Sequence, residues 1–553
     1  MKKWIMAGSL AALLFFVAWG VFEKTRPAME VQVFHQEKLN KLLERSKEKE
    51  EAQARLTFRE QVLPYDRESR TFFLPLNMEE TEFESGSFGT DTEGAEAVFL
   101  EDFTKSGKLT LMAGNESIPF YLVEKDGYSL CYLKITGVSI MNFASSEYTL
   151  EDGQPLFFLQ VYDNLAAGGE KSRTEGVRAA GDFVTACYTT SRLRGNTSLN
   201  YEKKSLRLNL YEQKKKDGSF QKTNESFLGM RKDNDWILNS LYADGSKIKD
   251  KLANDLWEQA GAGENPYKKT FGTHMEYVEV FINDSYQGLY GLMFPIDRKQ
   301  LGMASVSSQV EAGEEVIERI YKKKYTAEWK AEDFKGALFD ENMPDYRGGF
   351  FLKGDLLLQN EEEWAPLYEL AACIEGTDEE FTNNITSLVN QENVLQNWLF
   401  YQAIGGFDNY AKNYYYAVRN RDGSPQGYFI PWDLNISFGD VYTDNKYYCK
   451  ADFSIIKELI RWQPGQRMLD LNVEDSVGLL KQTWKDWRNT MFSDNAVISE
   501  IERLEAVVKD SGAYEREKER WPGGRYEEDF SGMKEFAVGR LAYVDEYVEG
   551  LRE

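Results

Sequence analysis

Histidine is almost absent from this sequence of 553 residues, which contains only His35 and His274. His35 falls in a charged stretch with helical spacing and His274 in an expected strand, and neither has a ligand-like neighbour. A Ser-His-Asp triad and a zinc site built on histidine both need a suitably partnered histidine. The sequence therefore indicates neither chemistry, and we expect both histidines to be structural or surface residues.

Cysteine is also sparse, and no pair has the CxxC spacing of a metal or redox motif. The four cysteines are Cys131, Cys187, Cys373 and Cys449. They fit buried thiols or one or two disulfides, and the sequence leaves both open. Four common catalytic signatures are absent as well, namely GxxxxGK(S/T), GxSxG, HExxH, and GxGxxG at a strand-to-helix junction.

Basic residues are in deficit, because 66 Lys and Arg face 91 Asp and Glu and give a net charge of −25. This field would repel a phosphate backbone, so we expect no nucleic-acid partner. Two short lysine runs, 214–216 and 322–324, are interpreted as solvated loops. Hydrophobic residues (42%) and aromatic residues (14%) are abundant enough to fill cores, and the many aromatic residues favour a protein that contains sheets.

The N-terminal third predicts three segments. Residues 1–24 carry an apolar run behind Lys2 and Lys3 that is long enough to cross a bilayer, so we expect a signal anchor and transmembrane helix with the bulk of the chain extracytoplasmic. Cleavage as a signal peptide, followed by secretion, is the alternative. Residues 25–62 are charged with helical spacing and predict a helical stalk. Residues 63–150, with short runs such as 108–112, predict a small β-rich accessory domain.

Residues 151–553 mix the patterns of strands and helices, which predicts an α+β unit that carries the chemistry. The expected strands are 156–161, 183–193 and 205–210, with a hairpin around 283–284. The expected helices are 247–260, 394–404 and much of the acidic portion after residue 474. No internal repeat divides this region.

The clearest chemical pattern lies between residues 405 and 433. Asp408 is followed five positions later by Asn413, and Asp433 comes after an expected strand pair at 414–419 and 428–431. Phosphoryl transfer needs a carboxylate near the attacking hydroxyl and oxygen ligands for Mg²⁺, which kinases take from a D-x-x-x-x-N loop and a later Asp. That spacing alone is common in turns. The order helix, loop Asp, Asn, hairpin, strand-end Asp is typical of the large lobe of a kinase-like active site.

Six sequence blocks in the same order resemble the CotH-type spore-coat kinase family. They are RGN at 194–196 with KKS at 203–205; WIL at 236–238 with DGSKIKDKLA at 244–253; YVEVFIN at 277–283 with GLY at 288–290; FLKGD at 351–355; GGFDNYAKN at 405–413; and WDL at 432–434 with FG at 438–439. The resemblance implies an atypical protein-kinase-like fold of two lobes over residues 151–553, with ATP and Mg²⁺ as cofactors.

The resemblance also implies which residues do the chemistry. Asp408 would be the catalytic base or would orient the hydroxyl, and Asn413 and Asp433 would hold Mg²⁺. A lysine of the small lobe would neutralise the nucleotide phosphates, beside a tight glycine turn. The residues implied for nucleotide binding are Lys203, Lys204, Arg194, Gly195 and Asn196. Adjacent strand residues face opposite ways, so we expect only one of the two lysines in the cleft.

Three positions depart from the family pattern. Phe294 stands where the family commonly has Glu, Asn435 replaces the second Asp of W-D-x-D, and Lys249-Asp250 replaces Arg-Asn. A missing carboxylate weakens cation binding, so two functions stay open. One is an ATP- and Mg²⁺-dependent kinase that phosphorylates Ser or Thr of a Ser- and Lys-rich coat or surface protein. The other is a membrane-anchored, exported pseudokinase that acts as a binding or structural protein.

Overall fold

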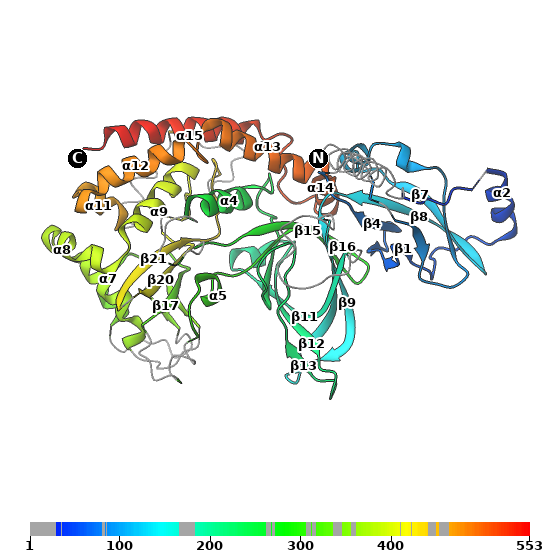
Figure 1. The fold of residues 1–553 in the computed structure, drawn as a ribbon, viewed down its shortest axis with the longest axis horizontal. Coiled ribbons are helices and arrows are strands. Elements are labelled where there is room, and N and C mark those ends of the chain that lie inside the picture. Colours follow the sequence, from blue (N-terminus) through cyan, green and yellow to red (C-terminus); the bar gives the residue numbers. More distant parts are fainter. Residues whose placement is uncertain are drawn as a thin grey trace, which may run out of the picture.

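The computed structural model describes residues 29–34, 36–79, 83–84, 86–164, 183–261, 267, 271–305, 311, 317–335, 345–354, 361–409, 411–421, 423–440, 450–452 and 464–552. Figure 1 shows three parts in a row: an N-terminal β-rich part in blue, a group of long strands in the middle, and a part that combines a sheet with most of the helices. Helices α13 (Asp494–Asp510) and α15 (Ser531–Gly550) run along one edge of this third part.

The N-terminal part contains two sheets of the orders β3-β4-β8-β7-β6 and β2-β1-β5. Their strands are β1 Leu56–Phe58, β2 Gln61–Val62, β3 Tyr65–Asp66, β4 Thr71–Pro75, β5 Phe88–Thr90, β6 Glu96–Phe99, β7 Ile118–Glu124 and β8 Gly127–Thr136. Aromatic residues such as Phe72, Phe99 and Phe120 fill the core between them. The run 108–112, expected as a strand, instead lies in helix α3 (Lys108–Ala113), which buries Leu111 and Met112. That prediction was wrong.

The expected helical stalk is also wrong. Helix α2 covers only Gln36–Arg45, and its Leu39 is buried against Phe34 and Val98 of the β-rich part. Isolated bridges join Val33 to Phe99 and Glu48 to Tyr128, so the segment around α2 follows the β-rich part and does not project from it. Leu39 of this helix therefore packs on the β-rich part.

The expected membrane anchor is not supported, and neither is the membrane-anchored, extracytoplasmic localisation that depended on it. None of the helices in the described residues combines the length and the apolar composition that a bilayer crossing needs. The longest described helix, α15, carries charged residues such as Lys534, Arg540 and Asp545 along its length. Residues 1–24, where the anchor was expected, lie outside the described residues, as do His35 and Cys449. The fold class is therefore corrected to a mixed α and β structure with many strands.

The middle part is an eight-stranded sheet of the order β11-β10-β9-β15-β16-β14-β12-β13 that closes on itself, because β11 also pairs with β12. Its strands are β9 Ser139–Thr149, β10 Pro155–Tyr162, β11 Val184–Arg194, β12 Ser205–Gln213, β13 Phe220–Lys222, β14 Asp235–Asn239, β15 Met275–Ile282 and β16 Tyr286–Met293. Alternate residues such as Phe143, Leu208 and Trp236 fill the interior, as in a small barrel. Strand β9 lies within residues 63–150 yet belongs to this barrel.

The third part is built on a five-stranded sheet of the order β18-β19-β17-β20-β21. Its strands are β17 Arg319–Lys323, β18 Tyr346–Arg347, β19 Phe350–Lys353, β20 Tyr414–Arg421 and β21 Ser424–Pro431. The helices of this part are α7 Ala365–Glu375, α8 Asp378–Leu388, α9 Gln391–Ile404, α11 Gly465–Asp470, α12 Ser476–Arg488, α13 and α15, whereas α14 Ala513–Arg520 lies against β16 of the barrel. The expected helices at 394–404 and after 474 are confirmed. Because β17 includes Lys322, the interpretation of 322–324 as a solvated loop was wrong.

Helix α14 connects the parts. Arg516 pairs with Glu279 of β15 (Nε–Oε1 2.7 Å) and also donates to Thr136 of β8 (2.8 Å) and to Asn115 (3.0 Å). The next residue, Glu517, accepts from Lys203 and from the backbone N–H of Leu289, both at 2.8 Å. One short helix therefore buries two oppositely charged side chains against the barrel, and Arg516 also contacts the N-terminal part.

Candidate active site

The loop 405–413 follows helix α9 and leads into strand β20. Gly405 ends the helix in the left-handed conformation (φ 63°), which glycine adopts without a steric penalty. The hairpin of β20 and β21 pairs Tyr414 with Pro431, and the backbone N–H of Trp432 donates to the carbonyl of Asn413 (3.2 Å). The open end of this hairpin thus places the end of the loop beside Asp433.

Asp408 is held firmly inside this loop. Its side chain is buried, with 6% exposed. The amide of Asn413 donates to Oδ2 (2.6 Å), and Nζ of Lys412 lies 3.2 Å from Oδ1. Asn413 and Asp433 both have positive φ angles, 58° and 59°. Such angles are uncommon outside glycine and cluster at functional sites.

Asn409 connects the loop to the strand end. Its fully buried amide donates to the carbonyl oxygens of Asn413 and Trp432, each at 2.9 Å. One side chain therefore fixes the spacing between the segments that carry Asp408 and Asp433. The sequence does not single out this residue, because an asparagine beside the motif gives no sign of its distant acceptors.

Asp250 brings a second carboxylate to the neighbourhood of Asp433. It lies in the first turn of helix α4 (Lys249–Gly261) and accepts from the backbone N–H of Leu434 (3.0 Å) and from the amides of Asn239 (2.8 Å) and Asn254 (3.1 Å). Burial, and next the charge of Asp433, raise the pKa of Asp250 to about 7. Within the described residues no cation forms an ion pair with either carboxylate. The sequence had singled out position 250 only as a departure from the family pattern.

Two cations lie near Asp433. Nζ of Lys322 is 4.9 Å from the ring centroid of Trp432 and 5.3 Å from that of Tyr415, and the guanidinium of Arg194 is 5.8 Å from the Trp432 ring. Burial, and next the charge of Arg194, lower the pKa of Lys322 to about 7, while the charge of Asp433 opposes that change. Carboxylate oxygens can bind a metal ion, and cationic side chains can pair with phosphate oxygens. The two kinds of group side by side therefore suit a metal-bound polyphosphate.

Lys203 and Lys204 lie just before strand β12, outside it, and their side chains have different partners. Lys203 is fully buried, pairs with both carboxylate oxygens of Glu517 (2.8 Å each) and donates to the carbonyl of Leu289 (2.5 Å). Lys204 donates to the backbone carbonyls of Leu199 (2.7 Å) and Tyr201. The structure therefore brings neither lysine beside Asp433.

Gly195 and Asn196 form the turn after Arg194. Gly195 has a φ of 116°, and a Cβ atom there would lie 1.9 Å from Oγ of Ser198. Only glycine fits this turn, which leads through Asn196 into the short helix Thr197–Asn200. The turn holds Arg194 at the end of β11, next to Trp432.

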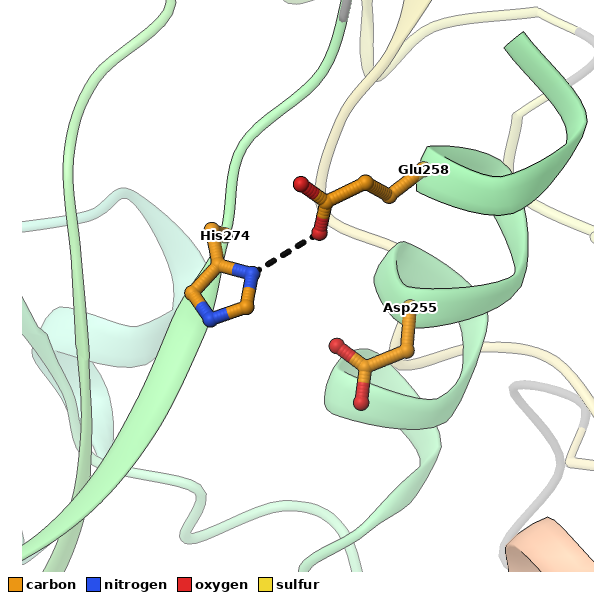
Figure 2. A group of neighbouring side chains, drawn as sticks. All are labelled: Asp255, Glu258 and His274. Atoms are coloured by element: carbon orange, nitrogen blue, oxygen red, sulfur yellow. Dashed lines mark hydrogen bonds and ion pairs between the residues drawn. The ribbon is translucent and has the colours of Figure 1, made fainter. Parts of the chain in front are cut away.

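A separate cluster joins α4 to β15 and is drawn in Figure 2: Asp255, Glu258 and His274 lie close enough together to hold a metal ion. Its charges are already paired. The ring nitrogens of His274 lie 2.8 Å from Glu258 and 2.7 Å from Glu276, and Lys251 lies 3.1 Å from Asp255. Burial alone would lower the pKa of His274, but the bonds with the two glutamates outweigh it and raise the pKa to about 9. The protonated ring has no lone pair for a metal, so this cluster is an ion-pair network.

A search of curated proteins finds no match to this chain. The family described as CotH kinase protein does match, over residues 191–544. The match begins at the end of β11 and ends within α15, so it contains Arg194, Asp250, Lys322, the 405–413 loop and Asp433. It covers more than half of the chain, which therefore belongs to the CotH kinase protein family.

Proposed function

We propose that this protein is an ATP- and Mg²⁺-dependent kinase that phosphorylates Ser or Thr side chains of proteins. One observation carries the proposal: the hairpin of β20 and β21 brings Asp408, Asn413 and Asp433 together. Asn413 donates to Asp408, and its carbonyl accepts from the N–H of Trp432, next to Asp433. Membership of the CotH kinase family supports the same activity.

Asp408 acts as the base in this proposal. The hydroxyl oxygen of the substrate attacks the γ-phosphorus of ATP, the bond to the β,γ-bridging oxygen breaks, and ADP leaves. The hydroxyl proton passes to a carboxylate oxygen of Asp408, which Asn413 and Lys412 hold in place. Because the carboxylate is fixed beforehand, the substrate hydroxyl meets it without rearrangement.

Asp433, Asp250 and Asn413 supply the oxygen atoms that would hold Mg²⁺, and the ion when bound would neutralise charge on the phosphates. Asp250 provides a carboxylate near the position where Asn435 lacks one. Arg194 and Lys322 would face the phosphate oxygens. We assign Lys203 an indirect part, in which its pair with Glu517 holds the barrel in shape.

Nucleotide binding and phosphate transfer test the assigned roles separately. Asp408→Asn should lower transfer to a Ser-rich basic peptide at least ~100-fold and leave the rise in melting temperature with ATP and Mg²⁺ intact. Asp433→Asn should abolish that rise. Asp217→Asn, in an exposed turn, is the matched control and should change neither. If neither ATP nor ADP shifts the melting temperature and no transfer occurs, the protein is a binding protein that lost the chemistry.

A further inference from the structure

Three lysines share one face of the sheet in the third part. Lys322 pairs with Phe351 and Ile320 with Lys353 across β17 and β19, so the alternation of side chains places Lys322, Phe351 and Lys353 on the same side. Lys324 continues this side, because its backbone N–H extends the ladder to Gly349 (2.9 Å). We define the lysine–aromatic face by its residues: Lys322, Lys324, Tyr325, Tyr346, Phe351 and Lys353.

Aromatic rings separate the ammonium groups of this face. Nζ of Lys324 lies 5.3 Å from the ring centroids of both Tyr325 and Phe351, and Nζ of Lys353 lies 5.8 Å from that of Phe351. The Tyr346 and Phe351 rings are 5.0 Å apart. Contacts between cations and ring faces are favourable and hold the lysines at a fixed spacing.

The positive charges of this face are not paired with acidic side chains of the described residues. In the part of the chain that the structure describes, none of its three ammonium groups has a hydrogen bond or an ion pair. Partial desolvation of its ammonium group lowers the pKa of Lys353, and the charges of Arg207 and Lys324 lower it further, although Asp345 opposes them. Crowded like charges cost free energy unless an anion joins them. A concentration of cations in a protein of net charge −25 therefore points to an anionic ligand.

The outer lysines are distinct from the cations beside Asp433. Lys322 lies against the rings of Trp432 and Tyr415, whereas Lys324 and Lys353 lie against the ring of Phe351, although the charges of both also act on Lys322. Lys353 and Tyr325 are exposed, and Tyr325 is 37% exposed. In the proposed function the nucleotide phosphates lie beside Asp433, where Arg194 and Lys322 would bind them. Lys324 and Lys353 are therefore available to a second anionic ligand.

We propose that Lys324 and Lys353 of the lysine–aromatic face bind a phosphoserine of the protein substrate. The proposal rests on the proposed function, because the reaction itself makes this phosphoserine. A segment held by one phosphorylated residue would present neighbouring hydroxyls to Asp408. Phosphorylation of a serine-rich tract would then accelerate as phosphates accumulate on it.

Peptide binding tests this face without any transfer. A fluorescent peptide with one phosphoserine and its unphosphorylated form are titrated into the Asp408→Asn protein without nucleotide. We expect the phosphopeptide to bind at least ~10-fold more tightly, which is a difference of about 1.4 kcal/mol. The double variant Lys324→Gln/Lys353→Gln should lose that difference and keep the rise in melting temperature with ATP and Mg²⁺. Lys214→Gln/Lys215→Gln, two exposed lysines in a turn, is the matched control.

Three results would overturn the proposal: equal binding of the two peptides, loss of nucleotide binding in the Lys324/Lys353 variant, or tighter binding of a single-stranded oligonucleotide than of the phosphopeptide. Equal binding would show that the face has no preference for phosphate. Loss of nucleotide binding would assign the face to the nucleotide, and tighter binding of the oligonucleotide would assign it to nucleic acid. Phosphopeptide binding without any transfer by the unmodified protein would refute the kinase reaction alone.

Discussion

At the scale of single residues, His274 shows how one imidazole links stability to pH. Its pKa is about 9 in the folded chain, above the value of about 6.5 usual for an unfolded chain. The bonds with Glu258 and Glu276 therefore stabilise the fold fully below pH 6.5, and this contribution is lost as pH rises through 9. Because the two glutamates are partly exposed, we expect His274→Gln to lower the free energy of unfolding by about 1 to 2 kcal/mol at pH 6 and by much less at pH 10. Urea unfolding of both proteins at the two pH values measures this, and an equal cost at both would contradict it.

Residue spacing predicted which residues of the candidate site lie together only where the motif is local. Asp408, Asn413 and Asp433 stand on one loop and one hairpin, so their order along the chain already suggested their neighbourhood. Asn409, Asp250 and Lys322 act through partners on other elements, such as the N–H of Leu434 and the ring of Trp432. No sequence period reveals such pairings, since they depend on how helix α4 and strand β17 pack against the hairpin.

At the scale of elements, the contact between α14 and β16 depends on the absence of a side chain at Gly288. Its φ is 97°, and a Cβ atom there would lie 2.1 Å from Oε2 of Glu517. Gly288→Ala should therefore lower the free energy of unfolding by about 2 to 4 kcal/mol, as the sum of backbone strain and displacement of Glu517. Gly153→Ala is the matched control, because Gly153 also has a positive φ (83°) but nothing within 4 Å. If chemical denaturation shows the same loss of unfolding free energy for both variants, the contact between Gly288 and Glu517 has no specific role.

The elements themselves were largely predictable, but the pairings between them were not. Helices α4 and α9 and the hairpin of β15 and β16 follow local patterns of apolar residues, and the structure confirms them. The parallel pairing of β9 with β15 joins strands more than a hundred residues apart, which no local pattern encodes. The helical spacing of apolar residues at 25–62 led to the wrong prediction of a stalk. A ten-residue amphipathic helix that packs on a sheet has the same spacing.

At the scale of the whole molecule, the fold depends on a few buried charges at the boundaries between its cores. The N-terminal part and the barrel each have an apolar core of their own, formed by separate groups of residues. Arg516 is almost fully buried and bonds to groups from both parts, Glu279 in the barrel and Thr136 at the end of β8. The two cores are therefore joined by this polar contact and by a small apolar cluster, in which Phe73 of β4 packs on Phe281 and Tyr286 of the barrel.

Arg516→Met should separate the unfolding of these two parts. The substitution leaves the carboxylate of Glu279 buried without its cation, which costs about 3 to 5 kcal/mol. Because the loss falls on the boundary, we expect differential scanning calorimetry to show one transition for the unmodified protein and two for the variant, with the N-terminal part unfolding first. Lys509→Met, on the partly exposed side of α13, is the control and should keep one transition. A single transition at lower temperature in the Arg516 variant would mean that the cores stay coupled through other contacts, since each core would then unfold only together with the other.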